Sequence, residues 1–140
     1  MNLKIIAKTE SDFPTKFGLP RQSGIVEGNL SRIVFEKEYA SPEAIRGLDG
    51  YSHIWLIWGF SQIKQKRWSP TVRPPRLGGN KRMGVFATRS PNRPNPLGLS
   101  CVRLVAIENG ALIVDGADLM DGTPIYDIKP YLPFTDSRPN

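Results

Sequence analysis

Two arginines four residues apart are held in the proline-rich stretch RSPNRPNPLGLS, residues 89–100. A guanidinium group binds a carboxylate or a phosphate through a two-pronged hydrogen bond, so Arg89 and Arg93 are candidates for an anionic ligand. The three prolines of this stretch exclude a helix, because proline lacks a backbone N–H and has a fixed φ. A stiff loop also loses less entropy when its arginines become fixed on binding. The stretch therefore predicts recognition of an anion.

A second group of polar residues lies near the C-terminus and consists of Asp118, Asp121, Asp127, Lys129 and Tyr131. These side chains can carry acid–base chemistry. Alternatively, one of the aspartates pairs with Arg89 or Arg93 inside the fold, since buried arginines are usually paired. Within this group the run Asp121-Gly122-Thr123-Pro124 is typical of a turn. Its functional alternative is a backbone cradle for a small ligand.

The basic residues are concentrated in the middle of the chain. The formal net charge is +6, and the window from Gly50 to Ile107 contains ten Lys and Arg residues but no Asp or Glu. Such a window indicates contact with a polyanion such as nucleic acid, against the alternative of a basic surface that maintains solubility. Trp68 lies in this window, where it either stacks on a base or packs locally.

The residue inventory disfavours several kinds of catalysis. Cys101 is the only cysteine and His53 the only histidine, which excludes an internal disulfide and a cysteine-based metal site and disfavours zinc. His53 lies in an apolar segment, so it is either a hydrogen-bonded core residue or a catalyst. The chain has no G-x-S-x-G elbow, no Walker A loop and no G-x-G-x-x-G. With no apolar run long enough to span a bilayer and no signal peptide, we expect a cytoplasmic protein.

Short segments rich in β-branched residues predict the strands that must position these groups. The predicted strands are 3–8, 30–35, 51–60, 83–88, 99–108, 111–116 and 124–131. The apolar residues of 51–60 occupy both faces, which suits a strand covered on both sides. The pair Asn109-Gly110 predicts a tight hairpin, because both residues tolerate positive φ.

Only one short helix is predicted, with Ser41 as its N-cap, Pro42 in its first turn and Gly47 at its end. The segment 64–82 is predicted to be a long basic loop without regular structure. A chain of 140 residues with many short strands suggests a single domain, residues 1–140, that is mainly β: a closed barrel or a sandwich. From the residues alone, this is a basic all-β domain for an anionic ligand or RNA.

Four segments together resemble the TsaA/TrmO family of tRNA methyltransferases: FGLPRQSG at 17–24, YSHIWLIWGF at 51–60, residues 72–104, and DLMDGTPIYDIKPYLPF at 118–134. The resemblance implies a small closed β-barrel unlike the Rossmann-like methyltransferases. It also implies S-adenosylmethionine as cofactor and methylation of N6 of N6-threonylcarbamoyladenosine, next to the tRNA anticodon. A homodimer with the cofactor near the subunit interface is implied as well. The chain resembles the short members that lack a further C-terminal domain.

The resemblance also implies roles for individual residues. Cofactor-binding positions by motif are Pro20, Arg21, Gln22, His53, Ile54, Arg89, Leu99, Asp121, Gly122, Thr123 and Pro124. Catalytic positions by motif are Asp127, Lys129 and Tyr131. Positions assigned to the substrate or to RNA phosphates are Arg73, Arg76, Lys81, Arg82 and Arg93. A proton must leave the attacked nitrogen, and Asp127 is the first candidate for the general base, with Tyr131, His53 or solvent as alternatives.

Three functional hypotheses remain open at this point. The first is a tRNA methyltransferase that uses S-adenosylmethionine. The second is a catalytically silent RNA-binding barrel, and the third is an S-adenosylmethionine-dependent enzyme with another small substrate.

Overall fold

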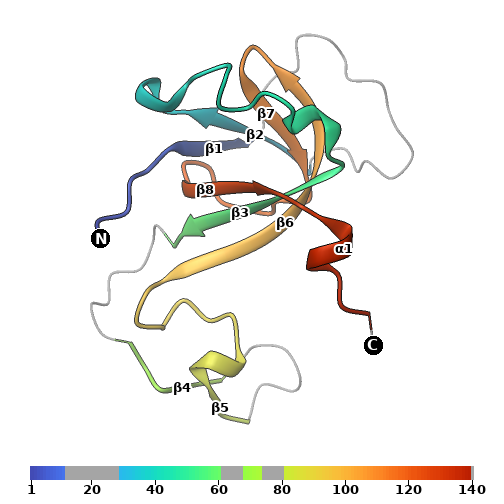
Figure 1. Cartoon of the computed structure of the whole chain (residues 1–140). Coiled ribbons are helices and arrows are strands. Elements are labelled where there is room, and N and C mark those ends of the chain that lie inside the picture. Colours follow the sequence, from blue (N-terminus) through green and yellow to red (C-terminus); the bar gives the residue numbers. More distant parts are fainter. Residues whose placement is uncertain (12–28, 61–67, 74–80, 140) are drawn as a thin grey trace.

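The computed structural model describes residues 1–11, 29–60, 68–73 and 81–139 and consists mainly of one closed β-barrel (Figure 1). Its strands, in hydrogen-bonding order, are β1 (Ala7–Ser11), β2 (Leu30–Phe35), β7 (Ala111–Asp115), β6 (Leu97–Glu108), β3 (His53–Gly59) and β8 (Pro124–Pro130). All neighbours are antiparallel, and β8 closes the barrel against β1. The predicted mainly β fold with a closed barrel is confirmed.

The barrel interior is filled by aliphatic side chains from alternate strand positions. On β3, Ile54 and Leu56 are fully buried, whereas Trp55 between them is only half-buried. Val102 of β6 and Ile125 of β8 meet them in the same core. Each such side chain contributes about 1.5–3 kcal/mol on full burial, so this inward stripe is the main stabilisation of the barrel. The outer face of β3 is thus partly exposed, where we expected cover on both sides.

The β6–β7 hairpin forms at the predicted Asn109-Gly110 pair. Both residues have positive φ, 53° and 80°. The pairing of Glu108 with Ala111 continues directly from this turn. A two-residue loop with this geometry matches the twist of the flanking strands. The predicted strands 30–35, 99–108, 111–116 and 124–131 are likewise confirmed, with small shifts at their ends.

Other predicted elements are wrong in detail. The first strand begins at Ala7, not at residue 3. The predicted helix after Ser41 is a series of turns with i→i−3 hydrogen bonds, followed by the 3-10 turn η2 (Leu48–Gly50). Segment 83–88 is not one strand, because β5 (Met83–Gly84) ends in the 3-10 turn η3 (Val85–Ala87). A further 3-10 turn, η1 (Lys37–Tyr39), follows β2.

A small lobe stands apart from the barrel and contains β4 (Thr71–Val72), β5 and η3 (lower part of Figure 1). β4 and β5 pair as a two-stranded antiparallel sheet. Val85 is buried in this lobe, and its N–H donates to the carbonyl of Pro70. Part of the loop predicted over 64–82 is therefore ordered as a strand, while residues 64–67 and 74–80 lie outside the described residues.

The chain ends with a short helix that the sequence reading did not predict, α1 (Pro133–Asp136). The carboxylate Oδ2 of Asp136 accepts hydrogen bonds of 2.9 Å from the N–H of Leu132 and from the indole of Trp55. These bonds hold α1 against the outer face of β3. None of the helices within the described residues is long and apolar enough to cross a membrane.

Candidate functional site

A hollow of about 1010 Å³ lies between one end of the barrel and the small lobe. We call it the arginine cleft, because Arg73, Arg82 and Arg89 line it together. The barrel contributes Trp58 and Leu99 to it, and the segment after β7 contributes Asp118. The cleft collects several of the positions predicted for cofactor and substrate: Arg73, Arg82, Arg89 and Leu99.

The aromatic wall of the cleft is Trp58 near the end of β3. Its indole N–H donates a 2.9 Å hydrogen bond to the hydroxyl of Ser100 on β6. Gly98, the residue opposite Trp58, leaves room for the ring, since a Cβ there would overlap the indole. Phe60 packs edge-on against the same ring, with centroids 4.5 Å apart. The indole is therefore fixed in orientation at the mouth of the barrel.

The basic wall of the cleft comes from the β4–β5 hairpin. Thr71 pairs with Gly84 and Val72 with Met83, so the next pair in this register is Arg73 with Arg82. Like charges opposite each other destabilise a strand pair, which favours an anionic ligand between them. The guanidinium of Arg82 is held by Thr71, with bonds of 2.8 Å and 3.0 Å to its hydroxyl. The structure thus brings these two predicted substrate residues together.

The loop that carries Arg89 and Arg93 is built by internal hydrogen bonds. Nη1 of Arg93 donates to the carbonyls of Thr88 and Ser90, at 2.9 Å and 3.0 Å. The hydroxyl of Ser90 in turn accepts from the N–H of Asn92. In the part of the chain that is described, neither arginine forms an ion pair, so the alternative of pairing with an aspartate is wrong. The Arg93 side chain thus stabilises its own loop through hydrogen bonds, whereas Arg89 lines the cleft.

The predicted catalytic residues lie on the outer face of the barrel, not inside the cleft. Ile57 of β3 opposes Leu99 on one side and Asp127 on the other. Strands lie about 4.8 Å apart, so the Cα atoms of Leu99 and Asp127 are separated by about 10 Å. Nζ of Lys129 lies 2.9 Å from Oδ2 of Asp127. Leu99, Ile57 and Asp127 thus form a row of paired residues across three strands, and this row runs from the cleft to the predicted base.

His53 and Ile54 lie farther from the cleft. His53 is four residues before Ile57, which corresponds to about 13 Å along a strand. Its Nδ1 lies 2.9 Å from the hydroxyl of Ser52, and its ring meets that of Tyr131 edge-on at 6.0 Å. The side chain of Ile54 is fully buried in the barrel core. The structure does not bring these two predicted cofactor positions to the arginine cleft.

The Asp121–Pro124 run forms the turn that enters β8 and closes the same end of the barrel. Asp121 Oδ1 accepts a 2.9 Å bond from the N–H of Ser11, and Gly122 has a φ of 80°. Thr123 is buried, and its hydroxyl donates to the carbonyl of Met120. The Asp121 carboxylate thus ties the end of β1 to the turn before β8. The predicted turn is confirmed; the residues just before it, Ala117 to Leu119, are the ones that line the cleft.

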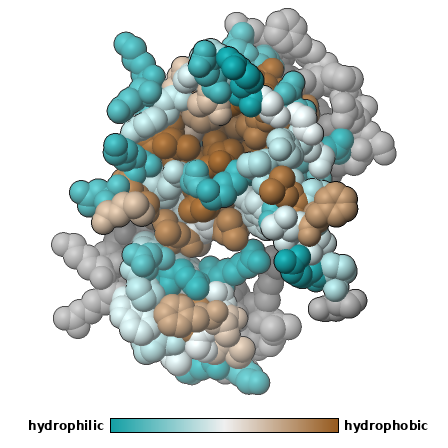
Figure 2. Space-filling view, viewed as in Figure 1, coloured by the Kyte–Doolittle hydropathy of each residue, from teal (hydrophilic) through white to brown (hydrophobic). Residues whose placement is uncertain are grey.

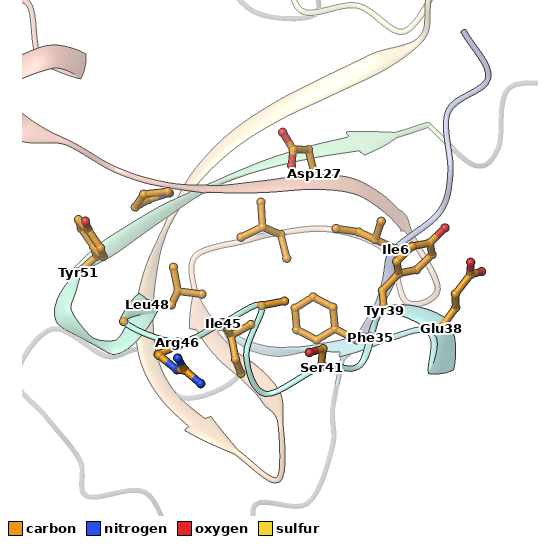
Figure 3. A pocket seen from close by; sticks show the side chains of 14 residues that line it. Ile6, Phe35, Glu38, Tyr39, Ser41, Ile45, Arg46, Leu48, Tyr51 and Asp127 are labelled. Carbon is orange, nitrogen blue, oxygen red and sulfur yellow. The ribbon is translucent and has the colours of Figure 1, made fainter.

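A second hollow of about 610 Å³ lies at the opposite end of the barrel (Figure 3). It is mostly apolar, with Phe35, Ile45 and Leu48 among its lining residues. Asp127 borders it, but Figure 3 shows its carboxylate on the far side of β8 from these three side chains. This hollow collects no other predicted site residue, and the arginine that lines it, Arg46, forms an ion pair of 3.5 Å with Glu43.

Cys101 also lies on the outer face, opposite Trp55 and between Leu99 and Arg103 on β6. Partial burial raises the pKa of its thiol, and the nearby carboxylate of Asp136 raises it further. The thiol is therefore protonated at neutral pH. It is not an activated nucleophile.

Several predicted positions fall outside the described residues: Pro20, Arg21, Gln22 and Arg76. Conversely, the structure adds Trp58 and Ser100 to the cleft, and of the polar group predicted near the C-terminus it places Asp118 there. Trp58 lies in an apolar segment whose sequence is equally typical of core packing, and only its pairing with Gly98 reveals that a ring lies over the glycine. That pairing joins segments about 40 residues apart, so local sequence patterns could not show it.

The comparisons with known proteins identify the family to which this fold belongs. The family model of the tRNA-methyltransferase O N-terminal domain matches residues 8–137. A relative in Escherichia coli (strain K12), named tRNA (adenine(37)-N6)-methyltransferase, is 47% identical over 139 residues, which cover 96% of this chain and 59% of the relative. A Pyrococcus abyssi relative, named a probable S-adenosyl-L-methionine-binding protein, is 44% identical over 98 residues, or 70% of this chain and 51% of the relative.

Solved structures give the same result. The crystal structure titled TrmO superposes with a TM-score of 0.73 at 38% identity and covers 99% of this chain and 60% of that one. The structure of TrmO from Pseudomonas aeruginosa gives a TM-score of 0.72 at 36% identity, with 99% and 58% covered. This chain thus spans a little over half the length of these relatives. By sequence and by fold, the chain belongs to the tRNA-methyltransferase O N-terminal domain family.

Proposed function

We propose that this protein is an S-adenosylmethionine-dependent tRNA methyltransferase that methylates N6 of N6-threonylcarbamoyladenosine at the position 3′ of the anticodon. The single observation that carries the proposal is the arginine cleft, in which Arg73, Arg82 and Arg89 share a hollow with the indole of Trp58. The names of relatives at 47% and 42% identity, both tRNA (adenine(37)-N6)-methyltransferases, supply the reaction class.

The residues of the cleft fit the chemical groups of S-adenosylmethionine. Arg89 suits the carboxylate of its methionyl part, because a guanidinium pairs with a carboxylate through two hydrogen bonds. Asp118 can accept hydrogen bonds from the ribose hydroxyls or from the ammonium group, and Trp58 offers an aromatic face to the adenine. When bound, this cofactor supplies a methyl group activated by a sulfonium. The exposed Leu99 lies at the edge between this site and the outer face.

The substrate requires a second anionic contact and an acceptor for a proton. Its threonyl arm ends in a carboxylate, for which Arg73 and Arg82 are the proposed partners. The attacked nitrogen carries a proton that has to leave, and Asp127 is the proposed acceptor. Lys81, exposed next to Arg82, is assigned to tRNA phosphates. Lys129 and Tyr131 follow the proposed base at alternate positions, where Lys129 pairs with it and Tyr131 packs near Trp55.

We further propose that the protein works as a homodimer. The outer face that carries Asp127 also exposes apolar side chains: Leu99 is 50% and Leu132 is 41% exposed, and Phe134 is fully exposed. A second subunit on this face would cover these side chains and enclose the row from Leu99 to Asp127. The cofactor site would then lie near the interface. A tRNA substrate implies that the protein acts in the cytoplasm.

Two measurements test the proposed function. Calorimetry with S-adenosylmethionine should give saturable binding that Arg89→Ala weakens. The absence of binding at millimolar cofactor would leave only the catalytically silent RNA-binding barrel. Purified protein should then transfer a labelled methyl group to tRNA that carries N6-threonylcarbamoyladenosine, and mass spectrometry of the nucleosides should find the N6-methylated form. Cofactor binding without this product would indicate another small substrate.

A further inference from the structure

Two large aromatic side chains are exposed side by side on the small lobe. Trp68 is 48% and Phe86 is 74% exposed. Their rings are nearly parallel, with an interplanar angle of 16° and centroids 6.2 Å apart. Figure 2 shows an apolar patch on this lobe, surrounded by hydrophilic residues. Of the other large apolar side chains of the lobe, Val85 is buried and Val72 and Met83 are half-buried, so this pair is the most exposed.

The backbone beneath the pair is held by hydrogen bonds on both sides. Ser69, next to Trp68, donates its N–H to the carbonyl of Asn92 at 2.9 Å, and its hydroxyl donates to the carbonyl of Thr71. Val85, next to Phe86, donates to Pro70 at 2.9 Å. The 3-10 turn η3, in place of the expected strand, directs Phe86 outward while Val85 points inward. The two rings are thus presented by a fixed scaffold.

The surroundings of the pair are positively charged. Arg73, Lys81, Arg82 and Arg89 are all exposed on the same lobe or beside it. No Asp or Glu occurs anywhere from Gly50 to Ile107 in the sequence. The pair also adjoins the arginine cleft, because Ser69 and Thr71 line that cleft. An aromatic face inside a one-sign basic surface matches the chemistry of a nucleic-acid strand, which offers flat bases and negative phosphates.

We propose that Trp68 and Phe86 form a stacking platform for an unpaired base of the RNA substrate, separate from the base that is methylated. This inference rests on the proposed function, which makes the loop of a tRNA the substrate. An enzyme that acts on one base of a loop must separate it from its neighbours, and a neighbour that loses its stacking partner needs another. The platform supplies one next to the cleft. Every base has a π-face, so this contact is independent of sequence.

The geometry distinguishes this pair from ordinary aromatic packing. Trp58 and Phe60 meet edge-on at 61°, and both are partly covered at the barrel end. Trp68 and Phe86 are stacked, which leaves an outer ring face open. A protein partner is the competing occupant for such a patch. The described residues of the lobe include several arginines and no Asp or Glu, which favours RNA over a protein partner, whose interface would need acidic complements.

The test measures the affinity of the protein for an RNA anticodon stem-loop that carries 2-aminopurine at one loop position at a time. Trp68→Ala and Phe86→Ala should each weaken binding about tenfold, as expected for the loss of one base–aromatic stack. Phe86→Leu, which keeps apolar area without a π-face, should weaken it similarly, while Trp68→Phe should retain most of the affinity. At the contacted position, 2-aminopurine should be quenched by wild type and not by Phe86→Ala. Replacing that nucleotide by an abasic one should abolish the difference between the two proteins.

Two controls separate stacking from charge and from folding. Lys81→Ala, which removes a proposed phosphate contact, should lower the slope of log affinity against log salt by about one, whereas Phe86→Ala should leave that slope unchanged. Tyr51→Ala, an exposed aromatic at the opposite end of the barrel, should bind RNA like wild type. Thermal melts should show that each variant folds, since Trp68 and Phe86 are exposed.

The outcomes distinguish this inference from the proposed function. If wild type binds neither S-adenosylmethionine nor the stem-loop, the proposed function fails and the platform with it. If wild type binds both, but the aromatic variants bind RNA equally well, the platform alone is wrong. If the variants change the sedimentation of the protein and not its RNA affinity, the patch is a protein interface and the inference is overturned.

Discussion

Asp127 and Lys129, two residues apart on β8, form an ion pair of 2.9 Å on the outer face of the barrel. Both side chains are largely exposed, 44% and 63%, so the pair adds little to stability. The pair matters because of where it lies: Asp127 is in the row of paired residues that begins with Leu99 at the cleft. A proposed base that already has a cationic neighbour is held in one orientation before the substrate arrives.

The first prediction concerns this pair. Asp127→Asn should lower turnover by about 10²–10⁴-fold, the usual contribution of a general base, while sparing affinity for S-adenosylmethionine. Single-turnover methylation of tRNA and calorimetry with the cofactor measure the two quantities separately. Lys129→Met, which removes only the neighbour, should have a smaller effect. Unchanged turnover in Asp127→Asn would show that Tyr131, His53 or solvent accepts the proton.

The second prediction uses the contact between Gly98 and Trp58. A methyl group in Gly98→Ala would overlap the indole, so the ring would have to move from the mouth of the barrel. Overpacking of this kind costs about 1–3 kcal/mol of the free energy of unfolding. We expect a lower Tm, loss of the bond to Ser100 and weaker cofactor binding.

Gly50→Ala is the matched control for this glycine. Gly50 lies at the opposite end of the barrel, and an added Cβ there meets nothing within 4 Å. Its Tm and cofactor affinity should equal those of wild type. A Gly98→Ala protein that melts and binds like the control would mean that the indole is free to move, against the fixed wall described above.

The sequence predicts the strands well, because an alternating or β-branched segment forms a strand wherever one of its faces is buried. It fails where local signals conflict. Between Pro42 and Gly47 only four residues remain, too few for a stable helix without packing, and no residue of the following turn η2 is buried. In the segment MGVFAT, Phe86 and Ala87 are both exposed after the buried Val85, which breaks the alternation that a strand needs.

The candidate site could be predicted only in part. The positions of the arginines can be read from the sequence, and two of them on a proline-rich loop indicate that the protein binds an anion. Which arginine faces the ligand depends on contacts between distant segments: Arg82 is fixed by Thr71 across the β4–β5 pair, and Arg93 turns back onto Thr88 and Ser90. Pairing across a barrel is set by strand order, which no local pattern encodes.

The third prediction separates these two roles of arginine. Arg93→Ala should remove two hydrogen bonds that hold the loop and so reduce stability and cofactor affinity, with little change in the salt dependence of tRNA binding. Arg73→Ala should instead weaken the binding of tRNA that carries N6-threonylcarbamoyladenosine more than that of tRNA that lacks it, while leaving Tm unchanged, since Arg73 is exposed. Binding titrations at several salt concentrations, together with thermal melts, measure both effects. A reduced salt slope in Arg93→Ala would assign Arg93 to a phosphate after all.

The fourth prediction concerns acid. The pKa of Asp136 is held below its usual range by the N–H of Leu132 and then by the indole of Trp55, and both bonds favour the charged carboxylate. Because the folded pKa is lower than the unfolded one, Asp136 contributes stability above the ordinary aspartate value of about 3.9. That contribution is lost as pH falls through the folded pKa.

Acidification below about pH 4 should therefore release α1 from β3, which the indole N–H signal of Trp55 reports by NMR. In Asp136→Asn, which cannot titrate, this signal should show no such step. A wild-type signal that stays constant down to the global acid transition would mean that the Asp136 carboxylate does not hold α1.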